Sequence, residues 1–285
     1  MRFSWERRTC RGEALGFIEL KVLLLAAIAG YLGVAGLVWL TQESMMFFPR
    51  PVTGTIAAPA GWRLERGSLE SRDGTRLAGV LALPPVERAP LVIYFGGNAE
   101  EVTEYAPEVA SEYGNRAVLL VNYRGYGASG GKPGEKAMVA DALEVFDWAA
   151  QHARLDAGRV AVHGRSLGTA VAVQLAAQRP VRCVVLTSPF SSAVHVARDF
   201  YSWLPVAWLM RHPFDLTAVA PRVKAPALVI YGAQDTIIRP RQSERLAAIW
   251  GGPVEKLLLP GFGHNDLHIT PRYGEAIRAF LDRCH

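Results

Sequence analysis

The chain has 285 residues, half of them hydrophobic and a fifth of them charged, with a formal net charge of +5. The basic residues are spread along the sequence without a basic run or interleaved aromatic residues, which argues against nucleic-acid binding. The three cysteines, Cys10, Cys183 and Cys284, form no disulfide framework or metal-ligand spacing, and no phosphate-binding loop occurs. We therefore expect no metal and no cofactor.

Near the start of the chain, an apolar segment without any charge covers residues 22–40. As a helix it is about 28 Å long, close to the roughly 30 Å hydrocarbon core of a bilayer. It lacks the polar stripe of a core helix. The sequence therefore predicts a transmembrane anchor that follows a cytoplasmic segment at residues 1–21. A cleaved signal peptide is the alternative, because Ala27-Ile28-Ala29 fits a cleavage site, but apolar residues continue to Leu40.

The charges on either side of this segment indicate its orientation. Basic residues precede it, and none follows before Arg50; those that precede it are Arg2, Arg7, Arg8, Arg11 and Lys21. The positive-inside rule then leaves the N-terminus in the cytoplasm and the rest of the chain on the periplasmic side, if the organism is a bacterium. Ala29 and Gly33 give a small-residue face that could pack against another helix, or that lipid simply tolerates.

After the anchor, apolar strand-like runs alternate with helical stretches. A hairpin around Asp73-Gly74 joins strands 63–71 and 75–82. The further predicted strands are 91–95, 117–122, 159–163, 182–187, 226–231 and 255–259, and the predicted helices are 100–113, 136–153, 168–178, 241–249 and 272–282. This alternation predicts an α/β fold, a mostly parallel sheet flanked by helices with an antiparallel edge. We expect one domain over residues 45–285 with an insertion at about 191–223.

The loop that follows strand 91–95 reads Gly96-Gly97-Asn98-Ala99-Glu100. Glycines allow the backbone to turn its N–H groups toward a pocket, where two donors would stabilise the oxyanion of an acyl-transfer reaction. We predict the N–H of Asn98 as one donor, with that of Gly97 as the second choice. An ordinary glycine turn is the alternative.

Strand 159–163 leads into Gly164-Arg165-Ser166-Leu167-Gly168 and then into a helix. A Gly-x-Ser-x-Gly between strand and helix is the nucleophile elbow, whose tight turn exposes the serine hydroxyl at the positive end of the helix. We predict Ser166 as a nucleophile and the backbone N–H of Leu167 as the other oxyanion donor.

The insertion at 191–223 is rich in aromatic residues between Phe200 and Met210. In a sheet of this kind, the insertion is expected to cover the active site, so Phe95, Trp203 and Trp208 are candidate residues of an apolar substrate pocket. Such a pocket beside a membrane anchor suggests an acyl chain, drawn from lipid. Simple packing of the insertion onto the sheet explains the same residues equally well.

A serine nucleophile needs a base and an acid, which follow it along the chain in the order acid, then histidine. Asp235 lies three residues after strand 226–231, and His264 follows strand 255–259 in Gly263-His264. We predict these as acid and base. His268 is a less favoured base, and Asp266 is too close to His264 and is expected to bind within its own turn.

These stretches together resemble the alpha/beta-hydrolase superfamily, in its Bem-type branch of membrane-anchored serine hydrolases. The resemblance rests on the segments Gly96-Gly97-Asn98-Ala99, Tyr123-Arg124-Gly125-Tyr126-Gly127, Gly164 to Thr169, Ser188-Pro189-Phe190 and Gly263-His264-Asn265-Asp266. Two positions depart from the branch pattern. Gly96 stands where many relatives have His, which would brace the loop, and Thr169 stands where relatives often have Gly.

The resemblance implies a membrane-anchored serine hydrolase that cleaves carboxylic esters or thioesters through an acyl-enzyme. The branch includes bacterial single-pass hydrolases and eukaryotic protein depalmitoylases, and its members hydrolyse several acyl linkages, so it does not settle the substrate. We expect a small acyl ester or thioester, which the aromatic insertion beside the anchor suggests is lipid-like. Two alternatives stay open. The same catalytic groups would serve a serine peptidase, and the fold would also serve a non-catalytic binding scaffold.

Overall fold

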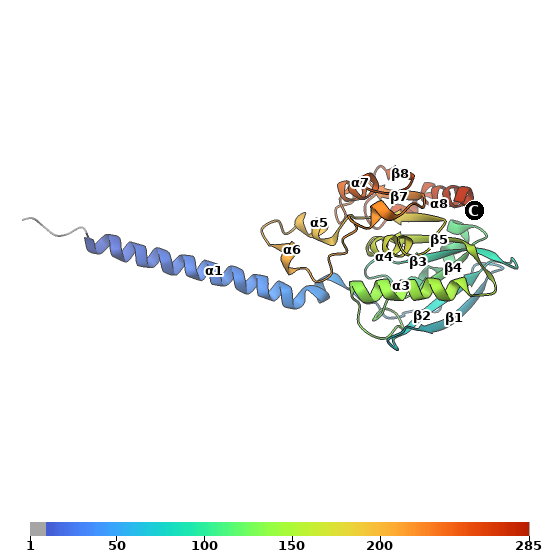
Figure 1. The fold of residues 1–285 in the computed structure, drawn as a ribbon, viewed down its shortest axis with the longest axis horizontal. Helices are drawn as coiled ribbons and strands as arrows, with labels where there is room; N and C mark the ends of the chain where they lie inside the picture. Colours follow the sequence, from blue (N-terminus) through green and yellow to red (C-terminus); the bar gives the residue numbers. More distant parts are fainter. Residues whose placement is uncertain (1–9, 285) are drawn as a thin grey trace, which may run out of the picture.

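The computed structural model of the protein describes residues 10–284, with side chains from residue 19 onward. Within them, eight strands form one sheet in the order β1-β2-β4-β3-β5-β6-β7-β8 (Figure 1). The pairs β1–β2 and β2–β4 are antiparallel, and the other pairs are parallel. The strands are β1 (Arg63–Glu70), β2 (Arg76–Leu83), β3 (Ala89–Phe95), β4 (Ala117–Val121), β5 (Leu155–Arg165), β6 (Cys183–Thr187), β7 (Ala227–Gly232) and β8 (Val254–Leu259). The predicted α/β fold with an antiparallel edge is confirmed.

Helices cover both faces of this sheet and bury a separate apolar cluster on each. On one face lie α3 (Glu135–Ala150), α4 (Leu167–Ala176) and α7 (Pro240–Ala248). On the other lie α2 (Val109–Tyr113) and α8 (Pro271–Cys284). Strands that are buried on both faces are apolar at nearly every position, which is why the central parallel strands β3, β4, β6 and β7 are recognisable as short continuous runs.

Two elements differ from their predicted extent. The helix predicted at 100–113 is a 3₁₀ helix, η1 (Val102–Glu108), followed by the short α2. Pro107 lies inside this stretch, and its missing N–H and ring prevent a continuous α-helix. Strand β5 begins at Leu155 rather than near Arg159, because Leu155 pairs with Ala89 before the register shifts.

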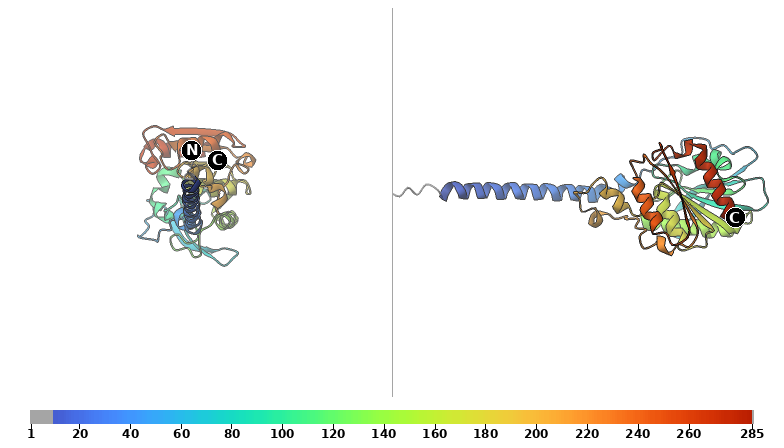
Figure 2. Two further views of the ribbon diagram at one scale, coloured as in Figure 1. Left: turned by 90° about the vertical axis from the view of Figure 1, so that its left-hand side faces the viewer. Right: turned by 90° about the horizontal axis from the view of Figure 1, so that it is seen from above.

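The helix α1 (Cys10–Met46) projects away from the globular part of the chain, as the views in Figures 1 and 2 agree. Its stretch Glu19–Met46 is long and apolar enough to cross a membrane, by length and composition, and it includes the predicted anchor. Most of its large apolar side chains are exposed. Residues 1–9 of the predicted cytoplasmic segment lie outside the described residues.

Residues 191–223, which we name the cap segment, connect β6 to β7. The segment contains α5 (Ala193–Arg198), α6 (Val206–Leu209) and η2 (Ala220–Arg222). In Figure 1, α5 and α6 lie beside the C-terminal end of α1, at the end of the globular part from which α1 projects. Ala35 of α1 packs there against Leu204 and Val206 of the cap segment.

A carboxyl group, that of Glu112, is buried beneath the sheet. Its Oε2 accepts a hydrogen bond from Tyr105, while Oε1 lies 3.9 Å from Nδ1 of His163. Burial raises the pKa of Glu112 to about 8 from a usual value of 4.5. The folded protein therefore keeps this group neutral at a pH where the unfolded chain ionises it.

We expect Glu112→Gln to make the protein more stable than wild type at pH 8.5 and to leave the two similar near pH 4.5. In the wild type, the neutral carboxyl of Glu112 stabilises the folded state fully below the unfolded-state pKa of 4.5. This stabilisation is lost as pH rises through the folded-state pKa of about 8, and it is on the order of a few kcal/mol in all. A neutral amide of the same shape has no proton to lose. Thermal midpoints of both proteins across this pH range measure the effect, and parallel curves would contradict the prediction.

Candidate active site

The turn between β5 and α4 holds Ser166 in an unusual backbone conformation, with φ 50° and ψ −115°. The N–H of Ser166 donates to the carbonyl oxygen of Thr187 at 2.8 Å, and the carbonyl oxygen of Ser166 accepts from the hydroxyl of Thr169 at 2.6 Å. A Cβ at Gly168 would collide with the carbonyl of Phe95, and one at Gly164 with the backbone of the first turn of α4. The turn therefore requires both glycines, and it fixes the serine at the head of the helix.

Three side chains from distant parts of the chain meet at this turn. Nε2 of His264 lies 2.9 Å from Oγ of Ser166, and Nδ1 of His264 lies 2.7 Å from Oδ2 of Asp235. Oδ1 of Asp235 accepts from the N–H groups of Ile237 and Ile238 at 2.9 and 2.8 Å. The carboxylate is buried and both its oxygens are bonded, so it has one fixed orientation toward the imidazole.

The loop that carries His264 is attached to the loop that carries Asp235. The N–H of Gln234 donates to the carbonyl of Phe262 at 2.9 Å, which joins the two loops directly. Asp266 accepts from the N–H of Gly263 at 2.7 Å, as a residue of the local turn. His268 follows in η3 (Leu267–Ile269), and neither Ser166 nor Asp235 binds it among the described residues. The geometry therefore favours His264 as the base.

The backbone donors beside Ser166 differ in their availability. Leu167 is the first residue of α4, where an N–H has no intrahelical acceptor. Among the described residues nothing accepts from the N–H of Asn98, whereas that of Gly97 donates to Glu100 at 2.7 Å. The N–H groups of Leu167 and Asn98 are therefore the candidate oxyanion donors, because the N–H of Gly97 is already bonded to Glu100. Both candidates border the same cavity as Ser166.

An ion pair that the sequence did not suggest braces this loop. Glu100 accepts from the N–H of Gly97, from the hydroxyl of Tyr94 at 2.7 Å and from Nη1 of Arg165 at 3.0 Å. The other guanidinium nitrogen of Arg165 donates to Asn265 at 3.0 Å. Arg165 therefore joins the elbow to the loop that follows β3 and to the loop of His264. The sequence signal for this role is the place of Arg165 between Gly164 and Ser166, because a side chain next to the elbow serine lies near the loops that surround the elbow.

Gly96 departs from the branch pattern without leaving the loop unsupported. The hydroxyl of Tyr123 donates to the carbonyl of Gly96 at 2.9 Å. A Cβ at Gly96 would collide with Val102 and lie close to Glu100. Position 96 therefore has no room for a larger side chain, and Glu100 makes the contacts that brace the loop.

The side chain of Asn98 connects the loop to the end of α1. Its amide nitrogen donates to the carbonyl of Met46 at 2.7 Å, and its oxygen accepts from the N–H of Phe48 at 2.9 Å. The hydroxyl of Tyr126 donates to the same oxygen at 2.7 Å. Asn98 therefore presents its backbone toward the site and uses its side chain to hold the start of the globular part.

Three further polar side chains, at positions 163, 195 and 215, have local structural partners. His163 is fully buried, 2.6 Å from the hydroxyl of Tyr113 and 2.9 Å from that of Thr187, and burial lowers the pKa of its imidazole to about 3. His195 binds the hydroxyl of Ser191. Asp215 accepts from the N–H of Thr217, two residues later.

A cavity of about 350 Å³ opens beside Ser166, within the size range of small-molecule sites. It lies between α1, the cap segment and the elbow. Its walls are mainly apolar, and they consist of Val38, Gln42, Met45 and Met46 from α1, of Asn98, Ser166, Leu167, Phe190, Ile237 and Ile238, and of Ala193, Val196, Ala197, Phe200, Tyr201, Leu204, Val206, Leu209 and Met210 from the cap segment.

The three pocket residues suggested by the sequence do not line this cavity. Phe95 ends β3 inside the core. Trp203 faces α1, where its ring meets that of Tyr31 edge-on. Trp208 is 91% exposed, because α6 turns Val206 and Leu209 to the cavity and so directs the position between them outward. Other cap residues, Phe200 and Tyr201 among them, supply the aromatic wall.

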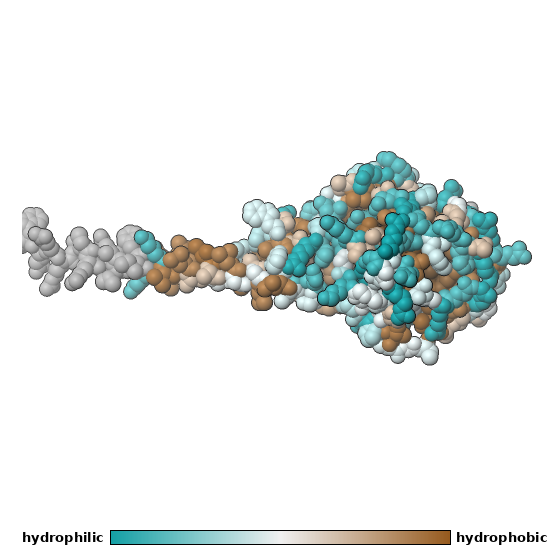
Figure 3. Space-filling model, turned by 60° about the horizontal axis from the view of Figure 1, so that its bottom comes forward, coloured by the Kyte–Doolittle hydropathy of each residue, from teal (hydrophilic) through white to brown (hydrophobic). Residues whose placement is uncertain are grey.

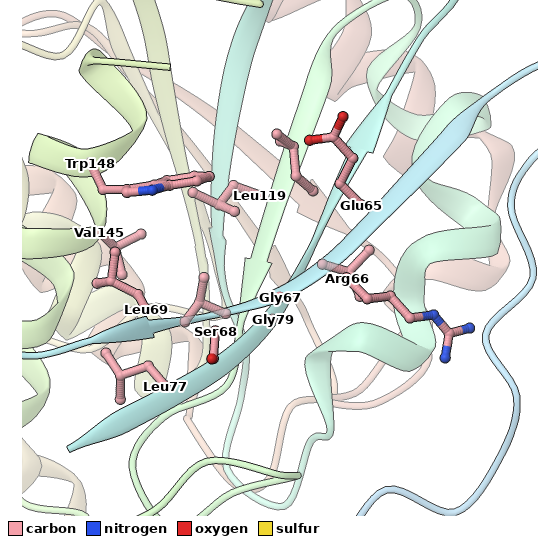
Figure 4. Close-up of a pocket in the computed structure, with 13 residues that line it drawn as sticks. Glu65, Arg66, Gly67, Ser68, Leu69, Leu77, Gly79, Leu119, Val145 and Trp148 are labelled. Carbon is pink, nitrogen blue, oxygen red and sulfur yellow. The ribbon is translucent and has the colours of Figure 1, made fainter. Parts of the chain in front are cut away.

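Two further cavities differ in character. One of about 320 Å³ lies on another side of His264 and is more polar, with Arg50, Glu101, Glu104, Glu108 and Arg165 in its wall. The other, of about 170 Å³, lies between the β1–β2 hairpin and α3 and includes none of Ser166, Asp235 and His264. Figure 4 shows the ring of Trp148 and the side chains of Leu69 and Leu77 around this hollow.

Comparisons with known proteins find hydrolase families and relatives of this chain. Residues 73–203 match the X-Pro dipeptidyl-peptidase (S15) family, and residues 157–279 match the serine hydrolase (FSH1) family. An uncharacterized protein of Mycobacterium tuberculosis is 36% identical over 268 residues, 91% of this chain and 93% of that protein. Protein bem46 of Schizosaccharomyces pombe is 26% identical over 281 residues, 93% of this chain and 94% of that protein. Human alpha/beta hydrolase domain-containing protein 17B is 31% identical over 175 residues, 59% and 57% of the two chains.

Solved structures share the fold at lower identity. An acetyl xylan esterase from Paenibacillus sp. R4 superposes with a TM-score of 0.68 at 18% identity, over 87% of this chain and 93% of that one. The Pyrococcus furiosus esterase Pf2001 gives 0.63 at 20% identity, over 83% and 99%. Together with the elbow geometry, these matches place the chain in the alpha/beta-hydrolase superfamily, among the serine hydrolases of its Bem46-type branch.

Proposed function

We propose that this protein is a membrane-anchored serine esterase or thioesterase that works through an acyl-enzyme. The observation that carries the proposal is the continuous set of hydrogen bonds from Ser166 through His264 to Asp235. A neutral hydroxyl is a weak nucleophile, and a base within hydrogen-bond distance, held by a buried carboxylate, activates it.

In the proposed reaction, Oγ of Ser166 attacks the acyl carbon and its proton passes to Nε2 of His264. The N–H groups of Leu167 and Asn98 donate to the resulting oxyanion. The carbon–oxygen or carbon–sulfur bond then breaks, and His264 returns the proton to the leaving group. A water molecule, deprotonated by His264, attacks the acyl-enzyme and releases a carboxylic acid and free Ser166.

The surroundings of the site support an amphiphilic substrate. The larger apolar cavity borders Ser166 and Leu167, which suits an acyl chain. The more polar cavity borders His264, the group that protonates the leaving group. We therefore infer that the acyl chain occupies the first cavity and a polar alcohol or thiol leaves through the second.

Membrane anchoring rests on α1, whose apolar surface is exposed along most of its described length. Exposure of this kind is unfavourable in water and is expected in lipid. The basic residues before the span place the globular part outside the cytoplasm in our proposal. A fluorophosphonate that cannot cross the inner membrane should label Ser166 in intact bacterial cells, and labelling only after lysis would reverse the orientation.

The substrate proposal predicts a clear dependence on chain length. With a series of 4-methylumbelliferyl esters from acetyl to decanoyl, kcat/KM should rise with length, because each methylene group that enters the apolar cavity contributes about 0.8 kcal/mol at most. Matched thioesters separate the two leaving-group classes. Equal kcat/KM across the series would contradict a role for the cavity in binding acyl chains.

A serine peptidase is the second candidate, favoured by the match of residues 73–203 to the X-Pro dipeptidyl-peptidase family. The acidic residues Glu101, Glu104 and Glu108 beside His264 would attract a substrate amine. Dipeptidyl 4-nitroanilides that end in proline distinguish the candidates. Faster turnover of these amides than of any ester would establish the peptidase.

A further inference from the structure

The cap segment packs along α1 as far as Tyr31, which lies within the stretch Glu19–Met46 that would span a membrane. The hydroxyl of Tyr31 donates to the carbonyl of Trp203 at 3.2 Å, and the two rings meet edge-on. Nearer the end of the helix, Gln42 donates to the carbonyl of Leu209 at 2.9 Å and accepts from the N–H of Arg211 at 2.7 Å. The contact with the cap segment thus extends along α1 from Tyr31 to Gln42.

The length of the helix makes this contact significant. From Lys21 to Tyr31 the helix rises only about 15 Å, about half of a hydrocarbon core of roughly 30 Å. The full core requires the stretch from Lys21 to about Leu40. If α1 crosses the bilayer with the observed packing, the cap segment beside Tyr31 must lie within one leaflet rather than above it.

The surface of the cap segment suits that position. From Phe200 to Met210 the sequence has no charged residue, and four large side chains there are exposed: Phe200 by 49%, Tyr201 by 43%, Trp203 by 56% and Trp208 by 91%. Tryptophan and tyrosine are enriched where a protein meets the lipid interface. In Figure 3, hydrophobic surface continues from α1 onto the adjoining end of the globular part.

Basic residues border this apolar surface. Arg198 lies two residues before Phe200, and Asp199 between them pairs with Arg241. Arg211 follows Met210, pairs with Glu43 at 3.2 Å and stacks on the ring of Trp39, 4.0 Å from its centre. The guanidinium of Arg239 lies 5.6 Å from the ring of Phe200. An apolar surface with a basic border is the pattern of an element that lies in the membrane interface, with its cations at the phosphate level.

The cavity beside Ser166 lies between these same two elements. Val38, Met45 and Met46 of α1 form one wall, and Phe200, Leu204 and Leu209 of the cap segment form another. The helix that anchors the protein is therefore also part of the site that would hold the acyl chain. Lipid chains around α1 would be adjacent to the cavity.

We propose that the cap segment is embedded in the leaflet on its side of the membrane, and that it forms with α1 a lateral entrance through which the acyl chain of a bilayer-resident lipid reaches Ser166. This inference rests on the proposed ester or thioester hydrolysis. It adds the source of the substrate, a lipid already in the bilayer, and it assigns Val38 to chain binding.

The position of the cap segment is tested without catalysis. The full-length protein is reconstituted in vesicles of phosphatidylcholine and phosphatidylglycerol whose acyl chains carry bromine, which quenches nearby tryptophan. Replacing both Trp203 and Trp208 by Phe should remove much of the quenchable fluorescence and leave the signal of Trp39. Trp148→Phe, on α3, is the control and should leave the quenchable part intact. Unchanged quenching in the double variant would overturn the embedded position.

The entrance is tested with two substrates: 4-methylumbelliferyl palmitate within those vesicles, and 4-methylumbelliferyl butyrate in solution. Val38→Phe should lower the palmitate-to-butyrate ratio of kcat/KM at least about tenfold, because the larger side chain fills the cavity at α1; tenfold corresponds to about 1.4 kcal/mol. Val34→Phe adds the same ring at an exposed position of α1 outside the cavity, and it should keep the wild-type ratio.

A third comparison separates the source of the substrate from the shape of the cavity. Replacing Trp203 and Trp208 by Ser should lower the palmitate-to-butyrate ratio of kcat/KM when the palmitate ester is in vesicles. The same ester dispersed in detergent micelles should be hydrolysed at closer to the wild-type rate. Equal losses for both forms of palmitate, or none, would overturn lateral entry. If the wild type hydrolysed neither ester, the proposed function would fail, and the quenching result would still decide where the cap segment lies.

Discussion

Ser166→Ala is expected to lower kcat for ester hydrolysis by about 10³-fold or more, with little effect on stability. Alanine removes the only atom that can bond to the acyl carbon, and the methyl group leaves the backbone of the elbow in place. Initial rates with 4-methylumbelliferyl butyrate measure the loss, and a fluorophosphonate should no longer label the protein. Ser202→Ala, at an exposed position of the cap segment, is the control. Turnover near that of the wild type would refute Ser166 as nucleophile.

Asp235→Asn is expected to lower kcat by about 10⁴-fold, although the side chain keeps its shape. The N–H groups of Ile237 and Ile238 both donate to Oδ1, so an oxygen must stay at that position. The amide NH₂ of asparagine then faces Nδ1 of His264 and forces the proton of the imidazole onto Nε2. In that tautomer the ring cannot accept the proton of Ser166.

The same structure provides a matched control for this change. Asp215→Asn also replaces a carboxylate that accepts backbone N–H, but Asp215 is not part of the wall of the cavity beside Ser166, and its oxygen can still accept from Thr217. Its kcat should stay near the wild-type value. Thermal midpoints of both variants exclude unfolding as a cause. A loss of less than about tenfold in Asp235→Asn would mean that Asp235 does not set the tautomer.

Much of the fold was accessible from the sequence because the strands of a parallel sheet are short apolar runs between helices. Each predicted strand lies within a few residues of its observed place, and β5 was underestimated since its first residues, Leu155 to Gly158, mix polar and apolar side chains. The segment before β4 differs from the single predicted helix because apolar periodicity does not reveal the interruption at Pro107.

The positions of Ser166, Asp235 and His264 followed from turn chemistry at the ends of strands, where parallel strands bring distant loops together. The pocket was different. Whether Trp203 or Leu204 faces a cavity depends on how a short irregular segment packs against α1, and no periodicity in the sequence encodes that. The bracing pair Glu100 and Arg165 was missed for a related reason, since its partners lie far apart in sequence.

The hydrogen bonds from Asn98 to the residues just after the helix have a practical consequence. A shortened, detergent-free form of the enzyme that starts beyond Phe48 would lack two of the groups that hold the Asn98 side chain. It would also lack one wall of the chamber beside the nucleophile. Removing α1 to ease purification is thus expected to impair catalysis itself, because hydrogen bonds join the end of this helix to the loop of Asn98.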